Sequence, residues 1–136
     1  MVTTDDVIER LKQLGFDPED GLTELDRKAI EFELRKTYNY IMNYCNIPTI
    51  DEIPEILNPR IIDKTCGEFL FYKKNSGSLP GFNYDPVIKS IREGDTTLTY
   101  AVGQGEDTPE NRFDAFVKSL ERGFDKWITP HRRLRW

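Results

Sequence analysis

The chain has 136 residues, of which 38% are hydrophobic and 32% charged, and its formal net charge is −5. This length suffices for one domain with a hydrophobic core of its own. The net acidity argues against a general nucleic-acid-binding protein, which needs a basic face. No stretch is apolar enough to span a bilayer, and residues 1–6 are acidic where a secretory signal would be basic, so we expect a cytoplasmic protein with no membrane partner.

The negative charge is concentrated at one end of the chain. Residues 1–31 carry nine acidic and four basic side chains, and the resulting −5 equals the whole net charge. The rest of the chain is therefore balanced, and residues 129–136 are basic. Such charge polarity occurs in proteins that stack head to tail. Charged runs are usually solvated faces, however, so the pattern alone is weak evidence for stacking.

Two helices are expected in the N-terminal third. Thr3 with Asp6 fits a capping box and predicts a helix from Thr4 to Leu14, and Thr23 with Asp26 fits a second box that opens a helix over residues 24–45. Apolar residues on the second helix recur at spacings of three and four, which predicts a buried face. That face comprises Ile30, Leu34, Tyr38, Ile41 and Cys45, and Tyr40 and Tyr44 widen it.

A third helix is predicted over residues 58–75 after an irregular, proline-containing connection. Asn58 and Pro59 suggest an N-cap followed by an N1 proline. Gly67 lies in the middle of this helix, where it costs about 1 kcal/mol relative to alanine, so we expect a neighbouring helix to approach closely there. The predicted inner line is Ile62, Cys66 and Phe69, with Ile61, Leu70 and Tyr72 beside it. Cys45 and Cys66 are both expected to be buried free thiols.

The segment over about residues 76–107 changes character. Asp85 and Pro86 suggest a short helix to Ile91, and residues 96–102 alternate as a β-strand does. A lone strand cannot satisfy its own backbone groups, so it either folds back as a hairpin or pairs with another chain. The second possibility favours an oligomer.

The last helix is predicted to run from Pro109 to Ile128, with Pro130 ending it. Its apolar stripe is Phe113, Phe116, Val117, Leu120, Phe124, Trp127 and Ile128. We therefore predict a mainly α protein: a small bundle of four to five helices with one short β-strand or hairpin between the last helices. The predicted organisation is one domain over residues 1–128, with the insertion at about 76–107, followed by a basic aromatic tail at 129–136.

Motifs for catalysis or cofactor binding are missing from the sequence. His131 is the one histidine, no CxxC pair exists, and Gly103-x-Gly105 lacks the context of a dinucleotide site. Asp63, Lys64 and Glu68 resemble a nuclease-like set in composition, but adjacent helical residues point about 100° apart, so the geometry fails. We expect no enzyme activity, no cofactor and no metal, and interpret the chain as an interaction protein.

The C-terminal segment has the composition of a docking peptide. Its charges would steer it and its large ring would anchor it on a partner. The candidate binding residues are Arg132, Arg133, Leu134, Arg135 and Trp136. The competing interpretation is a frayed chain end, and composition alone leaves both open.

Four segments together resemble a known family. They are Cys66–Phe71 followed by Lys73-Lys74 and Ser76-Gly77, then Ser90–Thr97, then Thr108-Pro109 with Arg112–Asp114, and finally Arg133–Trp136. In order and spacing they are similar to head–tail connector proteins of tailed phages, also called adaptor or head-completion proteins, which occur in siphophages and prophages. The resemblance covers most of the chain from Asn39 onward.

The resemblance implies a structural virion protein that assembles as a homo-oligomeric ring, expected to be twelve copies. Such a ring docks on the portal protein, extends the DNA channel and supports a head-closure or tail-completion protein, while genomic DNA passes without specific binding. It forms in the host cytoplasm and resides at the virion head–tail interface. The C-terminal residues are then expected to bind the portal, and the turn and strand to line the channel or join subunits (Gly94, Asp95, Thr96, Thr97 and Thr99).

Two other functions remain open from the sequence. One is a small helical regulatory or nucleic-acid-binding module that contacts phosphates through Arg132, Arg133 and Arg135, against which the net acidity counts. The other is an enzyme of unrecognised type.

Overall fold

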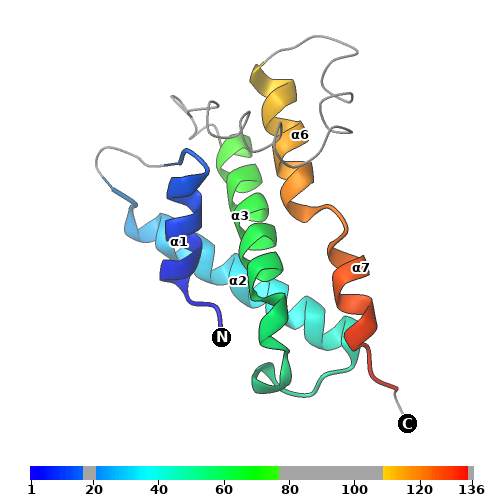
Figure 1. The fold of residues 1–136 in the computed structure, drawn as a ribbon. Helices are drawn as coiled ribbons and strands as arrows, with labels where there is room; N and C mark the ends of the chain where they lie inside the picture. The colour runs from blue at the N-terminus through cyan, green and yellow to red at the C-terminus, as the bar shows by residue number, and fades with distance from the viewer. Residues whose placement is uncertain (17–20, 77–108, 135–136) are drawn as a thin grey trace.

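The computed structural model describes residues 1–16, 21–76 and 109–134 (Figure 1). The described part is helical and contains no strand, which confirms the prediction of a small, mainly α bundle. Its helices are α1 (Thr4–Gln13), α2 (Glu24–Cys45), α3 (Asn58–Asn75), α6 (Pro109–Glu121) and α7 (Phe124–Ile128). The predicted short helix at 85–91 and the predicted strand at 96–102 lie outside the described residues.

Both predicted capping boxes are present. The Thr3 amide donates to Asp6 Oδ2 at 2.9 Å while the Asp6 amide donates to Thr3 Oγ1 at 3.2 Å. Thr23 and Asp26 repeat the exchange at 3.3 and 3.1 Å. Each box satisfies amides that the first turn of a helix leaves without partners, so α1 and α2 begin where these local pairs place them.

The start of α3 differs from the prediction. Asn58 is already helical, with φ −53° and ψ −47°, and neither it nor Leu57 makes a side-chain cap. A 3-10 turn over Glu55–Leu57 leads directly into the helix. The turn supplies the entry geometry, so an asparagine cap is not needed.

Helix α3 occupies the centre of the bundle. It packs against α1, α2 and α6, and Figure 1 shows it between α1 and α6 with α2 crossing behind. The five residues of the predicted α2 face are buried, whereas Tyr40, predicted to widen it, is 39% exposed, and both cysteines are buried free thiols as expected. On α3 the buried line runs through Ile61, Thr65, Cys66, Phe69 and Leu70. Tyr72, predicted beside that line, is half exposed instead.

The prediction for Gly67 is confirmed, because α6 passes close to it. A Cβ at this position would lie 3.1 Å from Glu121 Cγ and 3.4 Å from Leu120 Cβ. The lost helix propensity is thus offset by a close contact between α3 and α6.

The prediction of one continuous last helix is wrong. Helix α6 ends at Glu121, Gly123 adopts φ +72°, and α7 begins at Phe124. A right-handed helix cannot continue through a left-handed residue, so the chain forms two helices here. Phe124 and Ile128 still face inward, but Trp127, predicted in the buried stripe, is 49% exposed.

Across residues 1–16, 21–76 and 109–134, no helix is both long and apolar enough to cross a membrane.

Candidate docking surface at the C-terminal end

The structure describes three of the predicted site residues. Arg132, Arg133 and Leu134 follow a 3-10 turn over Thr129–His131 that continues directly from α7. The remaining predicted residues lie outside the described part of the chain: Arg135, Trp136, Gly94, Asp95, Thr96, Thr97 and Thr99.

Residues 129–134 are not detached from the bundle. The Arg133 amide donates to the Cys45 carbonyl at 2.7 Å, and Asn46 Nδ2 donates to the Arg133 carbonyl at 2.7 Å. Arg133 Nη1 also pairs with Glu52 Oε1 at 3.2 Å, and this hydrogen bond lowers the pKa of Glu52. The segment therefore caps the C-terminal end of α2, whose last carbonyls would otherwise lack donors.

This anchoring divides the three predicted residues into two roles. Arg133 holds the segment against the bundle. Arg132 is exposed and stacks its guanidinium over the Tyr44 ring at 5.4 Å, and Leu134 is 81% exposed. An exposed leucine on an anchored backbone is available to a partner at low cost in conformational entropy.

A groove that the sequence did not predict lies next to this segment. It encloses about 390 Å³ between α7 and the turn that precedes α3. Its lining residues are Ile56, Leu57, Lys126, Trp127, Pro130 and His131. Ile56 is 75% exposed, and the Arg60 guanidinium covers the Trp127 ring at 4.1 Å from its centroid. The break at Gly123 was the available sequence signal, because it turns Trp127 out of the core.

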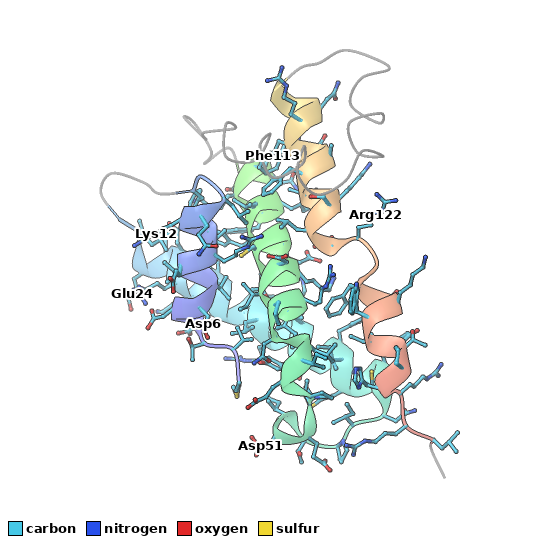
Figure 2. All side chains as sticks on the ribbon, in the orientation of Figure 1. Asp6, Lys12, Glu24, Asp51, Phe113 and Arg122 are labelled. Atoms are coloured by element: carbon cyan, nitrogen blue, oxygen red, sulfur yellow. The ribbon has the colours of Figure 1, made fainter. Side chains whose placement is uncertain are left out.

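Three cations lie near the groove without an ion-pair partner in the described chain, although the exposed Glu55 precedes Ile56 in the turn that forms one wall. Within the described residues, Arg60, Lys126 and Arg132 form no ion pair with a carboxylate. The acidic part of the chain lies elsewhere, since Figure 2 places Asp6 and Glu24 on the side of the bundle away from α7. The charge separation seen in the sequence is therefore also a separation in space.

Aromatic and polar contacts fix α7 on α2. The Tyr40 hydroxyl donates to Asp125 Oδ1 at 2.5 Å, which together with burial raises the pKa of Tyr40 to about 12. Tyr44 and Thr129 share a hydrogen bond of 2.9 Å, and the Tyr40 and Tyr44 rings stack at 5.8 Å. The surface that carries the groove is therefore preorganised.

A second cluster of charged side chains lies between α2, α3 and α6. Burial, and then the neighbouring Glu68 carboxylate, raise the pKa of Glu121 to about 7, while Lys64 acts in the opposite direction. Lys64 pairs with Glu68 at 3.6 Å, and Lys36 pairs with Glu33 at 2.9 Å. The raised pKa favours a neutral Glu121 carboxyl group near neutral pH, which limits like-charge repulsion with Glu68 where α3 and α6 meet.

Two further carboxylates, Asp63 and Asp26, form ion pairs within the bundle. Asp63, part of the nuclease-like set, accepts from Arg10 at 2.9 Å. Lys73 and Asp26 form a largely buried ion pair at 3.0 Å. Among the residues that the structure describes, no group of three or more His, Cys, Asp or Glu side chains could hold a metal ion.

Comparisons with protein families, with curated proteins and with solved structures find no match for this chain.

Proposed function

We propose that this protein is a structural connector of a tailed-phage head–tail interface. Copies of the chain form a ring, expected to be twelvefold, that docks on the portal protein, extends the DNA channel and supports a head-closure or tail-completion protein. It is assembled in the host cytoplasm and acts in the virion, without an enzymatic step or a cofactor. The proposal rests on the resemblance of four ordered segments to connector proteins.

The observation that carries the docking role is the anchored C-terminal segment. The Arg133 backbone is held by hydrogen bonds to the Cys45 carbonyl and from the Asn46 side chain, while Leu134 stays 81% exposed and the sequence continues with Arg135 and Trp136. A segment whose first part is anchored to the bundle, and whose last residues are apolar, basic and aromatic, is suited to insertion into a partner.

Ring assembly makes a weak single contact sufficient. Burying one Trp136 side chain removes about 200 Å² from water, or about 5 kcal/mol as an upper bound before the costs of ordering. One copy would bind weakly, whereas a ring presents many linked segments and gains avidity. The proposed channel residues Gly94, Asp95, Thr96, Thr97 and Thr99 carry no cation, which suits DNA passage without specific binding.

The test is binding to the portal protein encoded in the same genome, followed by co-sedimentation and negative-stain imaging. Deleting residues 130–136 would also remove the hydrogen bonds to Cys45 and Asn46, so a triple variant is preferable: Leu134→Ala, Arg135→Ala and Trp136→Ala. Lys12→Ala, an exposed substitution on α1, is the control.

Wild type and the control should add a ring-shaped layer to the portal, and the triple variant should not. Equal binding by the triple variant would reject the docking role of the segment. A wild-type protein that fails to associate with the portal at any salt concentration would reject the connector proposal.

One observation favours a second candidate, a regulatory or nucleic-acid-binding module. Arg132 has no carboxylate partner in the described chain and lies over the half-buried Tyr44 ring. Arg133, however, is already paired with Glu52, and the net charge is −5. A salt titration of oligonucleotide binding decides between them, because phosphate contacts must weaken steeply as salt rises.

A further inference from the structure

The groove beside α7 could bind a side chain of a partner protein. Ile56 and Leu57 form one wall and Trp127 and Pro130 the other, so the interior is apolar. Its volume of about 390 Å³ lies at the small end of the range for ligand pockets, which suits one or two side chains of a peptide.

The walls of this groove are held in place before any partner arrives. Leu57 is 1% exposed and its amide donates to the Pro54 carbonyl at 3.1 Å, which fixes the first wall. The second wall is fixed by the hydrogen bond of Asp125 with Tyr40, one turn from Pro130. A preformed site spends little binding free energy on ordering itself.

The rim of the groove selects a negative partner. Lys126 and His131 line it, Arg60 lies over Trp127, and Arg60 and Lys126 have no carboxylate partner in the described chain. A basic segment would meet like charges here, whereas carboxylates on either side of an apolar anchor would be complementary to the rim.

We propose that this groove binds a peptide segment of a partner protein in which a bulky apolar side chain is flanked by aspartate or glutamate. The apolar side chain enters between Ile56 and Trp127, and the flanking carboxylates pair with Lys126 and Arg60. This site is separate from the proposed portal-docking role, because there the C-terminal segment is inserted into the partner and here the groove is the receptor.

A peptide fits this surface better than a single-stranded nucleic acid does. Base recognition needs a free aromatic face for stacking, and the Arg60 guanidinium already covers one face of Trp127 at 4.1 Å. Aliphatic walls formed by Ile56 and Leu57 offer nothing to a phosphate backbone. The cations alone would attract either ligand, so the apolar walls decide in favour of the peptide.

The experiment selects short random peptides displayed on a library against the full chain and then measures the best synthetic peptide by calorimetry. Selected peptides should share a leucine, phenylalanine or tryptophan between acidic residues, and their affinity should fall with added salt. Ile56→Asp and Lys126→Glu should each weaken binding about tenfold or more, as expected for central contacts. Both side chains are exposed, so the fold should tolerate the changes.

Matched controls lie on the other side of the molecule. Leu25→Asp, at a 79% exposed leucine, and Lys12→Glu, at an exposed lysine, should leave peptide affinity unchanged. The triple variant at Leu134, Arg135 and Trp136 should also keep peptide binding. Loss of portal binding with peptide binding intact, or the reverse, therefore separates the two proposals.

Several outcomes would overturn the inference. These are no enrichment of any peptide, enrichment of basic or uncharged peptides, or a selected peptide that binds Ile56→Asp as well as wild type. An oligonucleotide that binds more tightly than every peptide, and loses affinity in Lys126→Glu, would reassign the groove to nucleic acid. Self-association that Ile56→Asp abolishes, with no peptide selected, would reassign it to a second copy of the chain.

Discussion

Replacing Glu121 by glutamine should stabilise the protein above neutral pH. The carboxyl group lies between α3 and α6, where burial and the Glu68 carboxylate raise its pKa to about 7 from an ordinary 4.5. The folded protein therefore retains a proton that the unfolded chain releases. Stability must fall as pH rises from 4.5 through 7, and then level off.

The size of the effect follows from that pKa difference. A pKa difference between about 7 and 4.5 corresponds to about 3 kcal/mol. Partial exposure of Glu121 and its electrostatic interaction with Glu68 reduce this contribution to about 2 kcal/mol. Glutamine keeps a donor for the Glu68 carboxylate but carries no charge at any pH, so the variant escapes the penalty.

The assay is urea unfolding of wild type and Glu121→Gln at pH 5 and pH 8. We expect nearly equal stabilities at pH 5 and a variant about 2 kcal/mol more stable at pH 8. Glu31→Gln, an exposed change on α2, controls for the loss of one negative charge. A variant that is less stable than wild type at pH 8, or a difference independent of pH, would refute the reasoning.

Three further predictions concern packing and anchoring. Gly67→Ala should lower the free energy of unfolding by about 1 kcal/mol, because the new methyl group would lie 3.1 Å from Glu121 Cγ on α6. This steric cost should exceed the gain in helix propensity. A higher free energy of unfolding would show that α6 moves aside easily. Lys73→Met should lower the free energy of chemical unfolding by about 3 kcal/mol, because it leaves the buried Asp26 carboxylate without its ion-pair partner. Lys12→Met, the control, should change the free energy of unfolding little. Equal losses in the two variants would contradict this prediction. Asn46→Gly keeps the left-handed backbone at φ 57° but removes the hydrogen bond to the Arg133 carbonyl. Labelling of the buried Cys45 thiol should therefore become several-fold faster. An unchanged labelling rate would argue against anchoring by this hydrogen bond.

Local sequence alone determined where α1 and α2 begin and which residues form the buried face of α2. The boxes at Thr3 and Thr23 act through residues three positions away, so no tertiary contact is needed to place them. The apolar stripe of α2 is likewise a property of spacing, and any packing partner would bury it. The C-terminal segment could be singled out as a binding element from composition, although its anchoring could not.

Tertiary structure decided which distant residues meet. Glu68 and Glu121 lie far apart in sequence, and the Glu68 carboxylate raises the pKa of Glu121 because α3 and α6 approach closely at Gly67. Arg133 and Cys45 are far apart in sequence and meet where the segment after α7 lies against the end of α2. The last helix breaks at the left-handed Gly123, and Trp127 beyond the break lines the groove instead of the core. Such outcomes depend on the relative placement of helices, which side-chain spacing within one helix does not encode.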